Sequence, residues 1–290
     1  MFLVSFFQAF LDYEFIRYAT YAGIIVGLLA PLIGTVVVVR RLSFIADTVS
    51  HFSLAGVCLG TLLSKFINNE FFNPLLLGIV FSILATFLIE KIRSFYKNYK
   101  ELSMPIVMSF GVALSGLFIS LSDNVDSKYT HSLLYGSIYS VDSGDIIIIL
   151  IIAVAVFLFA ITSYKKVVTL CFDETYARIS GVNVRFLQLA ITTILSIVIS
   201  LFIEIIGVLL IASLMIIPVA AAILIGDSYL HTTILSIIFS EISIVSGFVI
   251  SYHFDVTTGP IIILINILIL LIILLCKKIS RLKLKEKIEI

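Results

Sequence analysis

Long apolar segments dominate this chain and constrain its fold more than any other feature. A helix needs about 20 mostly apolar residues to cross a bilayer, and nine segments of the sequence come close to that length. The expected spans cover residues 15–39, 44–64, 74–90, 104–122, 144–163, 187–203, 205–226, 231–251 and 258–276. Since the stretch from 187 to 226 is too long for one span, we expect a turn or break within it, marked by Glu204.

The composition excludes a soluble protein. Hydrophobic residues make up 61% of the 290 residues and charged residues 13%, whereas soluble domains average about 45–50% and about 25%. The mean hydropathy is +1.21, and the net charge of +1 gives no field that would attract a nucleic acid. An ordinary soluble enzyme, a disordered chain and a nucleic-acid binder are therefore excluded. We expect an all-α integral membrane protein, a polytopic bundle of about 8–9 transmembrane helices that forms one domain over residues 1–290.

Basic residues predict the orientation, because Lys and Arg collect in cytoplasmic loops. Sixteen of the 19 basic residues fall in four clusters. The clusters are Arg40 and Arg41; Lys91, Arg93, Lys97 and Lys100; Lys165, Lys166, Arg178 and Arg185; and the six basic residues of a tail at 277–290. With nine spans, all four clusters are cytoplasmic and the N-terminus is external. An additional membrane segment at 1–14, or a merger of two spans, would place the N-terminus on the cytoplasmic side instead.

Asp47 and His51 are the strongest candidates for a site within the membrane. Charged groups inside a span are costly and are functional candidates by default. The two residues are four apart, so a helix places them on one face. A carboxylate and an imidazole are suitable ligands for a divalent ion such as zinc or manganese. A rise of about 1.5 Å per residue puts His51 about 15 Å beyond Arg41, near the middle of the bilayer. The alternative is an Asp–His hydrogen bond that locks helix packing.

Two glutamates also fall within apolar segments. Glu204 either faces a central pathway, where it would be a third metal ligand, or lies at the outer interface and caps a helix turn. Glu241 lies in the middle of its span. We favour a structural role for it, paired with a hydroxyl group of a neighbouring helix; the alternative is that it lines the path.

Four further candidates are expected on the outer side, where an incoming ion would arrive. They are Asp123, Asp126, His131 and His253. For the two histidines, a polar surface role is the alternative.

The cytoplasmic loop at about 164–186 is predicted to contain a short helix from Asp173 to Ser180. Gly181 follows it, and glycine is a common helix stop. Such a helix would either dock onto a soluble partner or rest on lipid headgroups. The chain has no GxxxxGK[ST] phosphate-binding loop, so an ATPase that drives transport would be a separate subunit. We expect no catalysis by this chain.

Several motifs occur together, and the chain resembles the permease subunits of bacterial ABC importers for zinc, manganese and related metals. The resemblance covers roughly residues 15–276. It is carried by RRLSFIADTVSHFSLAGV at 40–57, HSLLYGSIYSVDSGD at 131–145, FDETYARISGV at 172–182, GVLLIASLMIIPVAAA at 207–222 and SGFVISYHFDVTTGP at 246–260.

The resemblance implies a permease of the metal and vitamin B12 type in the bacterial cytoplasmic membrane, with its C-terminus inside. Two copies would form the pathway, a dimer of ATPase subunits would bind the cytoplasmic face, and an extracytoplasmic lipoprotein or periplasmic protein would deliver the metal. Asp47 and His51 match the family's metal pair, at the homodimer interface. Glu204 departs from the uncharged polar residue that is usual at its position. The coupling segment of the family matches Phe172, Asp173, Glu174, Ala177 and Gly181.

The resemblance also implies that the metal is cargo, with no cofactor bound permanently. Zinc is favoured over manganese or iron because the segment YEFIRYATYAGIIVGLLAPLIG at 13–34 is most similar to zinc members. The alternative function is an ATP-independent carrier or channel for a divalent cation. An intramembrane enzyme would need a base beside Asp47 and His51, and Glu204 and Glu241 are the candidates for it.

Overall fold

The chain folds into a bundle of helices. The computed structural model describes residues 8–67, 73–96, 98–121, 134, 143–254 and 256–288. The helices are α2 (Glu14–Val39), α3 (Phe44–Ile67), α4 (Pro74–Phe95), η1 (Lys100–Leu102), α5 (Ser103–Leu121), α7 (Ser143–Phe172), α8 (Glu174–Ile179), α9 (Val184–Ile206), α10 (Val208–Ile223), α11 (Tyr229–Phe254) and α12 (Thr258–Ile288). Within these ranges no residue forms a strand, which confirms the expected all-α class.

Eight of the described helices are long and apolar enough to cross a membrane, namely α2, α3, α4, α5 with η1, α7, α9, α11 and α12. The ninth expected span is α10, which has 16 residues. At about 1.5 Å per residue its length is about 24 Å, less than the roughly 30 Å of the hydrocarbon core. The structure thus has the expected 8–9 apolar helices, one of them short.

The break between the sixth and seventh apolar segments lies at Gly207, three residues after the position expected from the sequence. The backbone is helical through position 204 to Ile206, and α10 begins at Val208. Gly207 has φ of 81°, a backbone conformation that is unfavourable for any residue with a Cβ atom. A charged residue therefore did not mark the turn; the glycine did, because it can adopt the required backbone.

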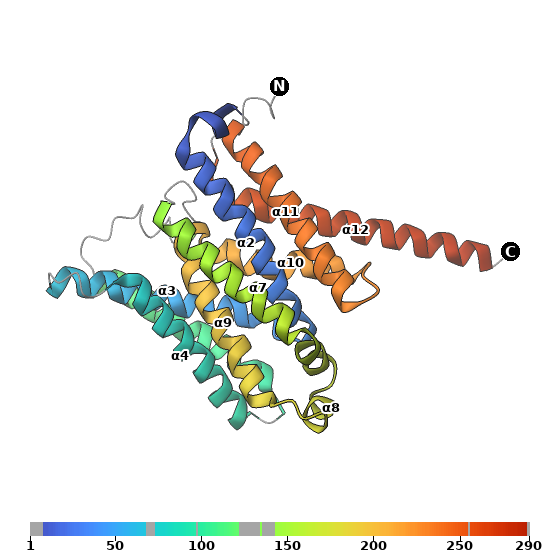
Figure 1. Ribbon diagram of the computed structural model, residues 1–290, viewed down its shortest axis with the longest axis horizontal. Coiled ribbons are helices and arrows are strands. Elements are labelled where there is room, and N and C mark those ends of the chain that lie inside the picture. The colour runs from blue at the N-terminus through green and yellow to red at the C-terminus, as the bar shows by residue number, and fades with distance from the viewer. Residues whose placement is uncertain are drawn as a thin grey trace.

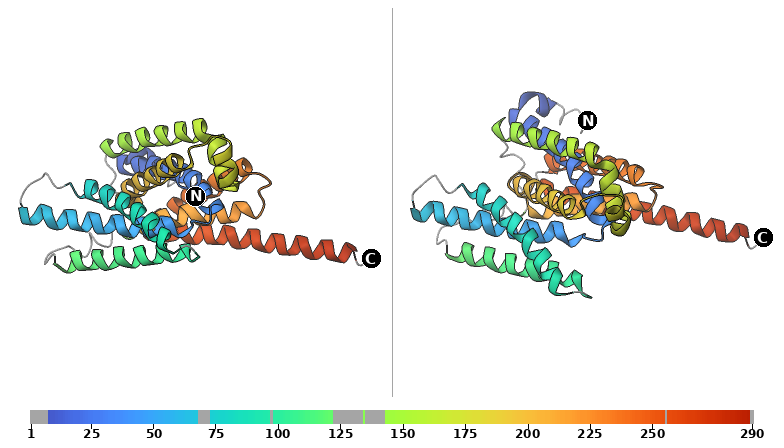
Figure 2. Two further views of the ribbon diagram at one scale, coloured as in Figure 1. Left: turned by 90° about the horizontal axis from the view of Figure 1, so that it is seen from below. Right: turned by 60° about the horizontal axis from the view of Figure 1, so that its bottom comes forward.

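The helices form two groups that share α9 and α10. In the first group α3 packs against α4 and α5, and in the second α2 packs against α7, α10 and α11. Both α9 and α10 contact α2 and α3. The side chains of Leu29, Phe52, Phe202 and Leu210 are fully buried where these helices meet. The last part of α12 projects away from the bundle in every view (Figure 1, Figure 2).

Glycines allow close approach at two helix contacts that matter for the site. At Gly34 of α2, a Cβ atom would collide with the backbone carbonyl of Met215 in α10. At Gly111 of α5, a Cβ atom would lie 3.0 Å from the backbone of Phe52 in α3. Small residues at such contacts are typical of membrane helices, and they fix α3 and α2 closely in the bundle.

Candidate functional site

Asp47 and His51 lie one turn apart near the start of α3. Asp47 is in the first turn of the helix, and His51 is seven residues beyond Phe44, or about 10 Å along the axis. Both side chains are half-buried, whereas their neighbours Ala46 and Val49 are fully buried. The pair therefore occupies the partly open face of a helix that is otherwise enclosed.

Hydrogen bonds to three neighbouring helices hold α3 on its buried faces. The Thr48 hydroxyl donates to the carbonyl of Met104 in α5, 3.2 Å away. The Ser53 hydroxyl lies 3.1 Å from the carbonyl of Gly78 in α4 and 2.9 Å from the hydroxyl of Ser200 in α9. These contacts fix the rotation of α3 about its axis, and thus the direction of its Asp47 face.

The ligand atoms of the pair remain unengaged. Asp47 and His51 interact with each other electrostatically. Within the described part of the chain, no hydrogen bond or ion pair holds either side chain to another residue. The Asp–His hydrogen bond of the structural alternative is therefore not formed, and both side chains keep free lone pairs.

No third ligand joins the pair among the described residues, which contain no cluster of three or more His, Cys, Asp or Glu side chains able to hold a metal. The side chain of Glu204 lies outside the described part. Glu241 lies instead against α2, where a Cβ atom at Gly27 would come within 2.8 Å of its Oε1. That oxygen is buried and lacks the hydroxyl partner expected from the sequence.

The outer candidates are described only in part. Asp123, Asp126 and His131 lie outside the described residues. His253 is half-buried near the end of α11, and its Nδ1 lies 2.8 Å from the carbonyl of Val249.

The expected short helix between the spans is present as α8. The Asp173 carboxylate caps its N-terminus by accepting from the backbone amides of Thr175 at 2.8 Å and Tyr176 at 3.0 Å. Gly181, with φ of 81°, ends it. The Glu174 carboxylate pairs with Arg178 across one turn, at 2.5 Å. The helix is thus specified locally, by a cap, an ion pair and a glycine stop.

One buried residue anchors α8, and its other residues are exposed, apolar and charged side chains alike. Ala177 is fully buried in a small cluster with Leu170 and Leu187. In contrast, Phe172, Tyr176 and Ile179 are 71%, 60% and 80% exposed. An exposed apolar patch of this kind is typical of an interaction surface.

Arg40 lies between α2 and α3, within electrostatic range of α8. It follows α2, is half-buried, and interacts electrostatically with Glu174 of α8 and Glu90 of α4. Burial lowers the pKa of its guanidinium from the ordinary value, and the two carboxylates act in the opposite direction. Arg40 therefore lies between the exposed helix and the turn that leads to Asp47.

The hydroxyl contacts that orient α3 and α4 were not expected from the sequence. The Ser82 hydroxyl donates to the carbonyl of Ser196, 3.1 Å away, and the Ser53–Ser200 contact lies one turn further along α9. The signal that could have found them is the four-residue spacing of Thr192, Ser196 and Ser200, which places three hydroxyls on one face of α9.

Comparison with known families gives one match that spans most of the chain. The model of the ABC 3 transport family matches residues 12–277.

Individual relatives match over nearly their full length. A "Probable metal transport system membrane protein" of Treponema pallidum is 31% identical and covers 93% of this chain and 98% of its own. A manganese transport system membrane protein of Listeria monocytogenes is 27% identical, covering 92% of each chain. A high-affinity zinc uptake system membrane protein of Buchnera aphidicola is 28% identical, covering 87% of this chain and 93% of its own.

A solved structure has the same fold. PsaBC from Streptococcus pneumoniae, in complex with a Fab, contains a chain that superposes with a TM-score of 0.81. The two chains are 26% identical, and the match covers 93% of this chain and 95% of that one.

Proposed function

The chain belongs to the ABC 3 transport family, and on this premise we propose that, as the membrane permease of a metal ABC importer, it passes a divalent ion along Asp47 and His51 between two copies of itself. The single observation that carries the proposal is the state of this pair. Both side chains lie on the half-open face of α3 without a hydrogen-bonding partner in the described part of the chain.

A second copy would complete the coordination shell. One chain supplies one carboxylate and one imidazole here, and the described residues offer no third ligand. Two copies related by a twofold axis would supply two of each, a number that suits a four-coordinate ion. Because a transported ion must also leave, a shell shared between two movable subunits is a suitable site.

The choice of metal is the finer part of the proposal. Carboxylate and imidazole ligands accept zinc, manganese and iron(II), and relatives are named for manganese and for zinc. We favour zinc from the sequence of the first span, with manganese and iron as the competing ions. Direct competition in transport decides among them.

The exposed side of α8 would receive the ATPase subunits. Phe172, Tyr176 and Ile179 provide the apolar contacts, while Ala177 ties the helix to the bundle. Movement of α8 would reach the metal site through Glu174 and Arg40, since Arg40 precedes the turn into α3. In this orientation the chain's C-terminus is cytoplasmic, and an extracytoplasmic binding protein delivers the ion on the opposite side, where Asp123, Asp126, His131 and His253 are the candidate contacts.

The competing function is a carrier or channel that works without ATP. It requires the same pair but has no use for the exposed side of α8. Transport by the permease alone would favour it.

The experiment is metal uptake into vesicles that contain the permease with its ATPase. Zinc and manganese are offered separately and together, with and without ATP. We expect ATP-dependent uptake that is lost in Asp47→Ala and in His51→Ala. The chain offers a matched control in Asp227 and His231, an exposed pair with the same spacing, 3.8 Å apart. Asp227→Ala and His231→Ala should transport normally.

The outcomes separate the two parts of the proposal. Uptake that persists in inserted and assembled Asp47→Ala and His51→Ala variants would contradict the metal site. Uptake that needs no ATPase would contradict the importer.

A further inference from the structure

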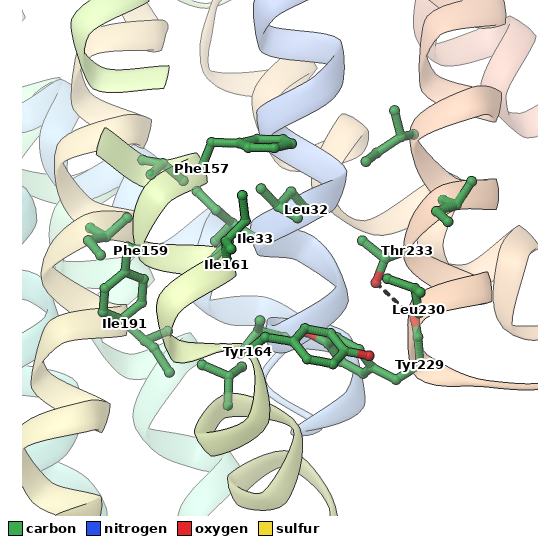
Figure 3. A pocket seen from close by; sticks show the side chains of 17 residues that line it. Leu32, Ile33, Phe157, Phe159, Ile161, Tyr164, Ile191, Tyr229, Leu230 and Thr233 are labelled. Atoms are coloured by element: carbon green, nitrogen blue, oxygen red, sulfur yellow. Dashed lines mark hydrogen bonds between the residues drawn. The ribbon is translucent and has the colours of Figure 1, made fainter. Parts of the chain in front are cut away.

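A cavity of about 520 Å³ lies between α2, α7, α9 and α11. Its walls are apolar side chains, among them Leu32, Phe157, Phe159 and Ile191 (Figure 3). The volume is within the range of about 300–1,000 Å³ that is usual for ligand pockets. None of the functions proposed above uses this space.

Polar atoms gather at one end of the cavity. The rings of Tyr164 and Tyr229 lie edge to face with their centres 6.0 Å apart, and Thr233 lies next to them (Figure 3). Tyr164 precedes the part of α7 that leads to α8, so in the proposed orientation this end is cytoplasmic. Tyrosines are typical of the headgroup level of a membrane.

The other walls open sideways from the bundle. Ile161, Leu230 and Ile234 line the cavity and are also exposed. Water would find few hydrogen-bonding partners in such an apolar space, and an empty space would forfeit dispersion contacts along its walls. Because the opening lies within the membrane-spanning part of α7 and α11, hydrocarbon chains are the molecules available to fill it.

Two lysines add positive charge at the tyrosine end. Lys165 and Lys166 directly follow Tyr164 on α7, although neither side chain lines the cavity itself. Both are exposed. The exposed carboxylate of Asp227, two residues before Tyr229, lies 3.8 Å from Nδ1 of His231. The tyrosine end of the cavity therefore lies next to two exposed lysines in the chain, which could reach an anion held there by long, flexible side chains.

We propose that this cavity binds an anionic phospholipid of the cytoplasmic leaflet, with one acyl chain between α7 and α11 and the headgroup at Lys165, Lys166 and the two tyrosines. The lipid would supply packing that protein does not, since α7 packs mainly against α2, α8 and α9. The assignment to the cytoplasmic leaflet rests on the proposed topology. Binding of the acyl chain in the cavity does not depend on that topology.

The test counts lipids that remain bound to the assembled transporter. The complex is purified in mild detergent, incubated with equal amounts of phosphatidylglycerol and phosphatidylcholine, and examined by native mass spectrometry. We expect retained phosphatidylglycerol. Ala160→Phe fills the cavity, and we expect it to lower retention about tenfold or more, because the added ring excludes the acyl chain. The matched control is Ala155→Phe, an exposed position on the same helix that does not line the cavity.

The headgroup is tested separately. The double variant Lys165→Gln/Lys166→Gln should keep lipid but lose the preference for phosphatidylglycerol. Lys91→Gln/Lys100→Gln, which removes two exposed lysines elsewhere, should keep the preference.

Three results would overturn the proposal. Equal lipid retention in Ala160→Phe and the native chain would exclude the cavity as the site, and an unchanged preference in the lysine variant would exclude the headgroup contacts. A disulfide between two Ile161→Cys copies, formed in a background without the native cysteines, would assign the cavity to a second copy of the chain. Retention is measured without metal or ATP, so its failure is distinct from a failure of the transport proposal.

Discussion

Helices α3 and α7 are both long enough to cross a membrane, but their surroundings are opposite. Among the eight candidate spans α3 has the lowest mean hydropathy and is the most buried, whereas α7 has the highest and is the least buried. The polar helix is thus enclosed by protein, and the most apolar helix borders the bilayer. Hydrophobicity alone would place them the other way round in a soluble protein, so the bundle follows the rule for a membrane solvent.

The difference also separates two kinds of role. Enclosure on three sides gives α3 a fixed orientation, which a ligand pair needs. The helix α7 leads directly to α8 and has a cavity beside it. The following predictions test this contrast, from the largest expected effect to the smallest.

Removing a large side chain should lower the stability of the protein much more on α3 than on α7. Phe52 is 1% exposed and Phe157 is 44% exposed. We expect Phe52→Ala to lower the stability by about 3–5 kcal/mol, because a cavity remains in a packed core, and Phe157→Ala to lower it much less, because lipid can fill the space. Thermal unfolding of the two variants in detergent with added lipid measures the difference. Equal losses of stability in the two variants would contradict the contrast between α3 and α7.

Replacing a glycine by a larger residue should lower the stability on one face of α5 and leave it unchanged on the other. A Cβ atom at Gly111 meets the backbone of Phe52 in α3 at 3.0 Å, whereas one at Gly116 meets nothing within 4 Å. Gly111→Val should therefore destabilise the protein by about 1–3 kcal/mol through overpacking. Gly116→Val is the control, and it should unfold at the temperature of the native chain. An unaffected Gly111→Val variant would show that α5 and α3 do not pack this closely.

A charge on the exposed side of α8 should weaken ATPase binding. We expect Ile179→Glu to lower the affinity for the ATPase about tenfold, equivalent to about 1.4 kcal/mol, because an apolar contact is replaced by a carboxylate. Ile225→Glu, at another exposed position, should leave the affinity for the ATPase unchanged. Titration of the two variants with the purified ATPase gives the values, and identical affinities would remove α8 from the interface.

Loss of the cap should have the smallest effect. Asp173→Ala removes the acceptor of two backbone amides and should destabilise α8 locally by about 1 kcal/mol. Hydrogen exchange should accelerate between residues 174 and 180 and stay unchanged in α3. Faster exchange throughout the bundle would mean that α8 supports the whole fold.

Much of the fold follows from the sequence because membrane spans have a simple signal. The apolar lengths gave the all-α class and the spans, and the capping pattern of Asp173 and Gly181 gave α8. The break was predicted at position 204 because a charge is conspicuous in an apolar run, whereas the positive φ of Gly207 becomes evident only in three dimensions.

The candidate site was predictable in part. The spacing of Asp47 and His51 is a local property, so the sequence puts them on one face. Their partly open surroundings depend on α4, α5 and α9, and the position of Glu241 against Gly27 depends on how α11 packs on α2. Such contacts join residues that are far apart in the chain, so no local sequence pattern predicts them.

The most direct test of the central claim is X-ray absorption spectroscopy of the assembled transporter, loaded with whichever metal it transports. We predict scattering from imidazole and carboxylate ligands in equal number, and loss of the imidazole signal in His51→Gln. A metal bound without imidazole ligands, or an identical spectrum from His51→Gln, would contradict a site built from Asp47 and His51.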